Sequence, residues 1–432
     1  MGKHDVNVLE AVITAASEAP RVLTGKIEHG TAAFWQTNFA LFAAGFATFA
    51  LLYCVQPLMP LFSADFGVSA AGASLALSLT TGLLAVSMLV AGGLSEAWGR
   101  KPIMVASLLL SGVLTVICAA APHWSTLLVM RALMGVALSG LPAVAMAYVG
   151  EEMHPRSLGQ AMGLYVGGTG LGGMAGRLLT GVITDAWGWR PAVFIIGVLG
   201  IVSAAVLWRC LPASRHFVRR ELRVAALTRA FGTHLRDGVL PLLFVEGFLL
   251  MGSFVTVYNY VGYRLIAPPF SLSQTSIGLI FVVYLFGIVS AALAGSVSGK
   301  LGRQVVLPAT FILMLAGTAM TLSNQLWMIV FGVAVLTIGF FGTHSVASAW
   351  VGARARVNKA QASSLYLFAY YMGSSVVGSL GGLFWNLRGW HGVVAMACTL
   401  LLIGLVIALW LCLMPTQPAQ ATHTADDARS SG

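Results

Sequence analysis

Long apolar runs separated by short polar segments dominate the chain. A helix that crosses a membrane needs about 20 mainly apolar residues, and twelve segments reach roughly that length. We expect spanning helices at 35–62, 73–94, 102–121, 124–150, 158–183, 190–211, 239–264, 275–298, 304–322, 326–350, 362–385 and 391–413. The pattern predicts an all-α integral membrane protein with twelve transmembrane helices.

The composition agrees with this fold class. Of the 432 residues, 58% are hydrophobic and only 9% are charged, whereas about a quarter of a soluble globular domain is charged. The five cysteines show no C-x-x-C spacing, so we predict neither a disulfide framework nor a metal site. No P-loop motif is present, so we expect neither ATP as the energy source nor another cofactor.

Lysine and arginine collect in alternate loops, which sets the orientation because these residues stay on the cytoplasmic side of a membrane. With the N-terminus inside, 19 of the 24 fall in inner segments, and only Arg190, Arg264 and Arg388 fall outside. We therefore predict that both termini are cytoplasmic, in the cytoplasmic (inner) membrane of a bacterium. The net charge of +10 then follows from topology, and no nucleic-acid partner is expected.

Polar segments divide the chain into five parts. We predict an N-terminal tail at 1–33, a six-helix half at 34–211, a basic linker at 212–238, a second six-helix half at 239–414 and a C-terminal tail at 415–432. The linker contains six arginines, which suggests an amphipathic segment on the inner membrane surface.

The two halves repeat short motifs in the same order. A shift of 203 residues superimposes three positions of two loops: Gly92, Gly99 and Arg100 fall on Gly295, Gly302 and Arg303. A shift of 201 places Gly188-Trp189 on Gly389-Trp390. Such a series indicates duplication, and parallel six-helix repeats are typical of alternating-access transporters that bind substrate between the halves.

The first of these loops resembles a motif of the major facilitator superfamily, G-x-L-A-D-R-x-G-R-K. It is matched by Gly92, Glu96, Gly99, Arg100 and Lys101, with Glu96 in place of the aspartate. The family's helix-4 motif R-x-x-Q-G is matched by Arg131 and Gly135. The resemblance covers 35–413. It implies twelve helices in two pseudo-symmetric halves and a secondary transporter, similar to the drug:proton antiporter branch that includes arabinose-efflux-like permeases.

We predict that these loops form a conformational gate. Glycines allow a tight turn, and Glu96 can face the positive N-terminus of a neighbouring helix, an interaction of about 0.3–1 kcal/mol. In relatives such a contact locks one conformer. The alternative is that the loops only fix the topology. The gate residues are Gly92, Glu96, Gly99, Arg100, Lys101, Gly302 and Arg303.

Glu246 is the only acid within a predicted span, and His344 lies at a similar depth in the tenth span. Charge inside a membrane is costly and usually functional. We predict that these two residues face each other and couple transport to protons. In the alternative interpretation Glu246 reaches the linker arginines and His344 bonds to a helix carbonyl.

Other intramembrane polar residues mark a candidate substrate cavity. Ser253 and Tyr260 recur with Glu246 at seven-residue intervals and so share one helix face. Tyr53 and Gln56 end an aromatic face of the first helix, and amide groups avoid lipid. The predicted cavity residues are Tyr53, Gln56, Arg131, Arg177, Ser253 and Tyr260. Alternatively, the aromatic face contacts lipid and Arg177 binds carbonyls of its glycine-rich helix.

The favoured function is proton-coupled efflux of a small organic compound, such as a drug, sugar or metabolite, by a monomer in the lipid bilayer. Arg131 and Arg177 favour a rival, the proton-coupled import of a small organic anion. A membrane sensor or scaffold without transport is a third hypothesis. An enzyme is not expected, because no constellation of nucleophile, metal ligands or paired acids lies near one surface.

Overall fold

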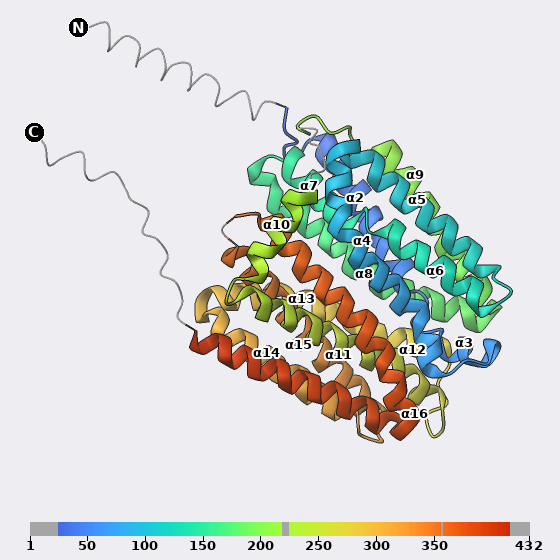
Figure 1. Ribbon diagram of the computed structural model, residues 1–432. Helices are drawn as coiled ribbons and strands as arrows, with labels where there is room; N and C mark the ends of the chain where they lie inside the picture. Colours follow the sequence, from blue (N-terminus) through green and yellow to red (C-terminus); the bar gives the residue numbers. More distant parts are fainter. Residues whose placement is uncertain (1–24, 218–223, 356, 415–432) are drawn as a thin grey trace, which may run out of the picture.

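The computed structural model describes residues 25–217, 224–355 and 357–414, and within these ranges the chain is helical with no β-strand (Figure 1). Most of the predicted N-terminal tail, all of the C-terminal tail and part of the linker lie outside the described residues. We call the side that carries the linker helix the inner side, as the lysine and arginine pattern predicts, and the opposite side the outer side.

The first half contains eight helical segments that form six spans. They are α2 (Ala32–Tyr53), α3 (Met59–Phe66), α4 (Ala70–Trp98), α5 (Arg100–Ala119), α6 (Trp124–Leu138), α7 (Pro142–Glu152), α8 (Pro155–Trp187) and α9 (Trp189–Cys210). The fourth span is built from α6 and α7, which are separated by a short break before Pro142.

The second half follows the linker helix α10 (Val224–Leu235). Its segments are α11 (Leu240–Ile266), α12 (Gln274–Ile280), η1 (Phe281–Val283), α13 (Tyr284–Leu301), α14 (Arg303–Met320), α15 (Leu326–Arg354) and α16 (Lys359–Leu413). The long α16 is two helices, because the backbone at Arg388 and Gly389 is not helical.

The predicted count of twelve spans is confirmed. Ten helices in the described part of the chain are long and apolar enough to cross a membrane. One of them, α16, is divided at Gly389, and α8 supplies the twelfth span. The sequence of α8 is rich in glycine, which lowers its hydropathy. These glycines let α8 approach α2 closely: a Cβ atom on Gly172 would overlap the carbonyl oxygen of Phe46.

The first predicted span was too long. The segment 35–62 was expected to be one helix, but α2 ends at Tyr53 and α3 begins at Met59. Pro57 and Pro60 lie at this break. Proline lacks a backbone N–H and interrupts a helix interior, so the chain turns here and leaves α3 on the outer side (Figure 1).

Four glycines explain why the loop motif recurs. Gly99, Gly188, Gly302 and Gly389 have φ angles of 101°, 86°, 87° and 56°. Each joins the second and third helix of a three-helix unit, and L side chains rarely adopt this conformation. The turns alternate between the inner and outer sides, as expected for inverted three-helix repeats within each half.

The halves meet near the outer ends of their helices. Helix α16 packs on α4, and α8 packs on α12. Ser375 Oγ donates a hydrogen bond of 2.7 Å to the carbonyl oxygen of Ser78, and a Cβ atom on Gly382 would overlap Cα of Ala71. We call the α4–α16 and α8–α12 contacts the outer seams. They close the molecule on this side.

The linker is attached to both halves. On the first half, Glu152 accepts hydrogen bonds from the backbone N–H groups of Arg215 and His216. On the second half, His234 Nε2 lies 3.1 Å from the carbonyl oxygen of Asn358. The linker thus crosses from one half to the other on the inner side.

Asp237 should stabilise the start of the second half. It pairs with Arg354 at 3.0 Å and accepts hydrogen bonds from the N–H groups of Val239 and Leu240. Burial opposes ionisation, but these contacts outweigh it and hold the pKa of Asp237 below its usual range. We expect Asp237→Ala to cost about 1 kcal/mol of stability, as loss of a helix cap does.

The pH dependence provides the check, measured by thermal unfolding in detergent. The folded-state pKa of Asp237 is lowered. The contribution of Asp237 to the stability of the folded state is therefore complete above the ordinary carboxyl pKa, and it is lost as the pH falls through the lowered folded-state pKa. The difference in stability between wild type and Asp237→Ala should therefore shrink under acid conditions. A difference that is constant with pH would contradict this assignment.

Candidate functional site

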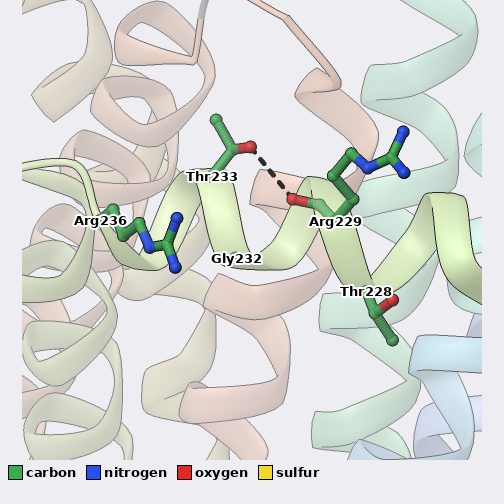
Figure 2. Close-up of a pocket in the computed structure, with 5 residues that line it drawn as sticks. All are labelled: Thr228, Arg229, Gly232, Thr233 and Arg236. Carbon is green, nitrogen blue, oxygen red and sulfur yellow. Dashed lines mark hydrogen bonds between the residues drawn. The ribbon is translucent and has the colours of Figure 1, made fainter.

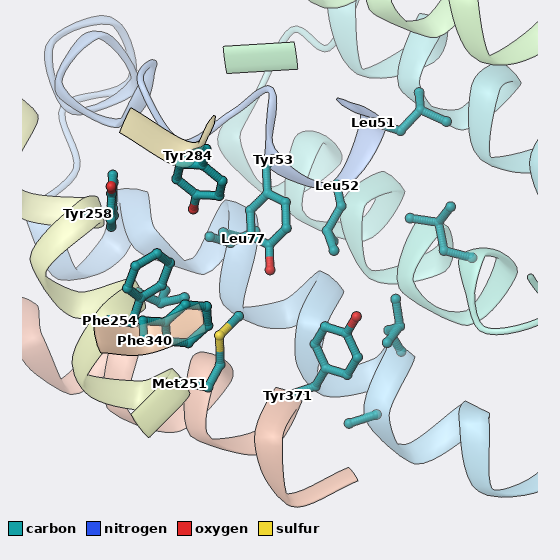
Figure 3. Close-up of a cluster of buried hydrophobic side chains, with 14 of the residues drawn as sticks. Leu51, Leu52, Tyr53, Leu77, Met251, Phe254, Tyr258, Tyr284, Phe340 and Tyr371 are labelled. Carbon is teal, nitrogen blue, oxygen red and sulfur yellow. The ribbon is translucent and has the colours of Figure 1, made fainter. Parts of the chain in front are cut away.

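Buried aromatic side chains of the second half gather around Tyr53 of the first half (Figure 3). Phe254 and Phe340 stack with their ring centroids 3.7 Å apart, and the hydroxyl groups of Tyr258 and Thr337 lie 2.6 Å apart. We define the aromatic centre as the buried residues Tyr53, Met251, Phe254, Tyr258, Tyr284, Phe340 and Tyr371.

Arg177 lies at the edge of this centre and is 1% exposed. Its guanidinium carbon stands 4.1 Å from the ring centroid of Tyr53, 4.9 Å from that of Phe281 and 4.8 Å from that of Tyr284. Its Nε donates to Gln56 Oε1 at 2.6 Å, and Nη1 donates to the carbonyl oxygen of Gly173 at 2.6 Å. The structure thus brings together Tyr53, Gln56 and Arg177.

Gln56 continues this network into the second half. Its Nε2 donates to Asn259 Oδ1 on α11 at 2.7 Å, and Asn259 is 1% exposed. Sequence reasoning missed Asn259, although an amide side chain within the apolar span 239–264 was a usable signal. Arg177, Gln56 and Asn259 therefore form a hydrogen-bonded chain between the halves, which we call the central relay.

Arg131 has a different environment. Its Nε, Nη1 and Nη2 donate to the carbonyl oxygens of Ala76, Leu51 and Leu52 at 2.7, 3.0 and 2.7 Å. The guanidinium thus ties α6 to α2 and α4 within the first half. These contacts are those of a packing residue, and its contact with substrate stays a prediction.

The polar residues predicted to share one face of α11 do not contact Arg177 among the described hydrogen bonds. Ser253 is buried and bonds within its own helix, to the carbonyl oxygen of Leu249 at 2.8 Å. Tyr260 donates to the carbonyl oxygen of Gly378 at 2.9 Å and stacks on Trp385. The structure therefore directs Tyr260 toward α16, and the cavity role of both residues stays a prediction.

Glu246 is fully buried, and neither carboxyl oxygen has a hydrogen-bond partner among the described residues. Its neighbour Gly247 packs closely against the ring of Tyr366, and the Tyr366 hydroxyl lies 3.0 Å from Nδ1 of His344. No hydrogen bond or ion pair joins Glu246 to His344 in the part of the chain that the structure describes. Tyr366, which sequence reasoning missed, contacts His344 and packs against the residue next to Glu246.

The inner loop of the first half is held by an ion pair. Arg100 donates to both carboxyl oxygens of Glu151, at 2.7 and 3.2 Å, and its distance to Glu96 is 3.8 Å. Lys101 Nζ donates to the carbonyl oxygen of Leu211. Glu96 therefore contacts its own loop, and Glu151 is a partner that the loop motif did not indicate.

The matching loop of the second half lacks such a pair within the described ranges. Arg303 follows Gly302 at the start of α14, as Arg100 follows Gly99 at the start of α5. A Cβ atom on Gly92 or Gly302 would meet nothing within 4 Å. The gate role of these loops stays a prediction.

A carboxylate closes one outer seam. Asp185 lies in α8 just after the predicted span 158–183. It accepts hydrogen bonds from the N–H groups of Gln274 and Thr275 at 3.1 and 2.7 Å. These groups open α12, where the helix dipole favours an anion. Burial opposes ionisation, but the hydrogen bonds outweigh it and lower the pKa of Asp185.

Asp185→Ala should weaken the outer closure by about 0.5–1 kcal/mol, the effect of losing a partly screened helix cap. We expect faster labelling of a cysteine placed at Gln274 by an impermeant maleimide added from outside. Asp185→Asn, which keeps an acceptor, should have a smaller effect. Equal labelling rates in wild type and Asp185→Ala would contradict the capping role.

A cleft of about 450 Å³ lies beside the linker helix on the inner side. It is lined by Thr228, Arg229, Gly232, Thr233 and Arg236. Figure 2 shows the two guanidinium groups standing off the same helix, while Thr233 Oγ bonds to the carbonyl oxygen of Arg229 at 3.0 Å. Among the described residues, the lining contains two cationic groups and no acid.

Comparison with known proteins places this geometry in a family. The family model described as Major Facilitator Superfamily matches residues 41–270 and 248–430. Among curated proteins, the "Uncharacterized MFS-type transporter YybF" of Bacillus subtilis (strain 168) is 50% identical over 89% of this chain and 94% of its own length. The "Inner membrane transport protein YnfM" of Escherichia coli (strain K12) is 49% identical over 88% and 91%.

Solved structures show the same fold at low identity. A mutant of the nucleoside transporter NupG gives a TM-score of 0.74 at 12% identity, covering 88% of this chain and 100% of that one. A bacterial homologue of the human lysosomal transporter Spinster, inward-facing and occupied, gives 0.71 at 15%, covering 87% and 96%. The chain belongs to the Major Facilitator Superfamily and is a multi-pass membrane transporter, not an enzyme.

Proposed function

We propose that this transporter couples the export of a small organic compound to protons, by alternating access, in the cytoplasmic membrane of a bacterium. Protons are exchanged for the compound through Glu246. The compound binds at the aromatic centre between the two halves. The similarity of the chain to the drug:proton antiporter branch, inferred from its sequence, favours this direction.

The environment of Glu246 carries the proposal. An ionised carboxylate that is buried without a partner is very costly, and neither oxygen of Glu246 has a partner among the described residues. A carboxyl group that carries a proton here and releases it when water reaches it can couple proton movement to a change of conformation. The ring of Tyr366 packs against the neighbouring Gly247, and the Tyr366 hydroxyl lies 3.0 Å from His344 Nδ1, so a water that bridged Glu246 to this pair would complete a route for the proton.

The arrangement of the halves supports alternating access. The outer seams hold the two halves together on the outer side, through Asp185, Ser375 and the glycines of α8 and α16. The central relay and the aromatic centre contain residues from both halves. Rocking of one half against the other would therefore open the centre to alternate sides.

Import with protons is the second candidate, because Arg177 supplies a buried cation that would attract an anion from outside. Inverted and right-side-out membrane vesicles distinguish export from import, because opposite faces of the transporter meet the added solutes. We expect energised inverted membrane vesicles, supplied with an extract of bacterial cytoplasm, to accumulate compounds that vesicles without the protein do not.

Accumulation only in right-side-out vesicles would support import. Accumulation in neither orientation would contradict transport and would favour the sensor or scaffold hypothesis.

A further inference from the structure

We infer that Arg177 binds an anionic group of the transported compound, so that the substrate is a small organic anion with an apolar or aromatic body. The inference rests on the proposed transport function, but it is independent of the direction of transport and of the role of Glu246. Four features of the structure support it.

The first is charge. Arg177 is 1% exposed, and no acid forms an ion pair with it among the described residues. A cation inside the membrane is costly and marks a functional site by default. Asp185, the next acid along α8, is committed to the N-terminus of α12. The counter-charge for Arg177 is therefore expected to come from a ligand.

The second is the contrast with Arg131. Three nitrogen atoms of Arg131 donate to backbone carbonyl groups of two neighbouring helices, so its donors are committed to helix packing in this structure. Arg177 has one backbone acceptor, Gly173, and that lies one turn back on its own helix. Its other contacts are side chains, Gln56 and three aromatic rings. Such contacts can rearrange when a ligand binds.

The third is the position of Arg177 between the halves. Tyr53 and Gln56 belong to the first half, whereas Phe281, Tyr284 and Asn259 belong to the second. Separation of the halves therefore uncovers the guanidinium, which is the step that admits substrate. Additional donors lie near it: Asn259 Nδ2 is buried with no partner among the described residues, and Tyr284, which carries a hydroxyl group, has its ring against Arg177. An anion accepts charge-assisted hydrogen bonds from such groups, and these are about twice as strong as neutral ones.

The fourth is the cleft beside α10. Arg229 and Arg236 line it, with no acid among its described lining residues (Figure 2). The linker contacts both halves on the inner side. A surface lined by one sign of charge raises the local concentration of the opposite charge. Anions are thus favoured at the inner approach as well as at the centre.

The test uses the full chain in vesicles of both orientations, with an extract of bacterial cytoplasm as the source of solutes and mass spectrometry as the readout. We expect the accumulated compounds to be anions at neutral pH. Arg177→Gln should lower their accumulation by about 10-fold or more, the equivalent of about 1.4 kcal/mol. Arg190→Gln is the matched control, because Arg190 bonds to carbonyl groups at the far end of the first half.

Arg177→Lys keeps the test decisive if the glutamine variant fails to fold. Lysine retains the charge but loses the planar fork of donors, so the half-saturation concentration should rise about 10-fold or more while the accumulated compounds remain anions. Accumulation of neutral or cationic compounds by wild type would overturn the inference and leave transport intact. So would unchanged anion transport in both Arg177 variants. No accumulation by wild type would instead overturn the proposed function, and the inference with it.

Discussion

Glu246→Gln is expected to abolish transport driven by a pH gradient while substrate exchange between the two sides of the membrane continues. Glutamine keeps the size of glutamate but cannot load and release a proton. The buried carboxyl has no partner in the described part of the chain, so the amide replaces it without breaking a hydrogen bond. The measurement is accumulation in proteoliposomes with an imposed pH gradient, compared with exchange of labelled compound without a gradient.

The matched control is Glu28→Gln, since Glu28 is exposed and lies before the first span. It should retain gradient-driven accumulation. The account of Glu246 would be wrong if Glu246→Gln accumulated substrate as wild type does. If Glu246→Gln lost both exchange and accumulation, Glu246 would serve substrate binding or folding and not proton coupling alone.

Gly382→Val and Gly181→Val should hold the outer side open. A Cβ atom on Gly382 would overlap Cα of Ala71, and one on Gly181 would lie 2.5 Å from the carbonyl oxygen of Gln274. Both contacts join backbone across the halves, so a larger side chain separates the helices. Overpacking of this kind costs about 1–3 kcal/mol. Here that cost falls only on the outer-closed state, and it shifts the population toward the outer-open state by about 5–150-fold.

The measurement is the rate at which an impermeant maleimide, added from outside, labels a cysteine placed at the buried Ser78 in a variant without native cysteines. Gly167→Val is the matched control on α8, because a Cβ atom there would meet nothing within 4 Å. Labelling that is faster in the seam variants and unchanged in the control supports the account. Equal rates in all three would show that the halves do not separate at these seams.

Much of the fold could be predicted from sequence because it depends on length and on repetition. Twelve apolar segments and the ordered motifs around Gly99 and Gly302 were enough for twelve helices in two halves. The break in the first span was missed because apolar length alone was counted, although Pro57 and Pro60 were visible. The backbone conformation shared by four glycines explains the repeated motif in physical terms that spacing alone could not supply.

The candidate site could be predicted only in part, because the identity of a polar residue does not reveal its partners. Arg131 matched a family motif and Arg177 lay in a glycine-rich helix, but both were predicted to line the substrate cavity. Their contacts in the structure separate them. Arg131 ties helices of a single half together, whereas Arg177 contacts Gln56 of the first half and aromatic rings of the second. Asn259 and Tyr366 were missed because their importance arises from contacts with residues more than 20 positions away.

The most direct test of the central claim, that two halves alternate under control of a proton on Glu246, is a pair of spin-label distances measured together. Trp187 and Leu387 are exposed on the outer side, and Trp98 and Leu301 are exposed on the inner side. In the wild type, a change from alkaline to acid pH should shift the outer and inner distances in opposite directions, and in Glu246→Gln neither distance should respond. Distances that change in the same direction, or a pH response that persists in Glu246→Gln, would contradict the account.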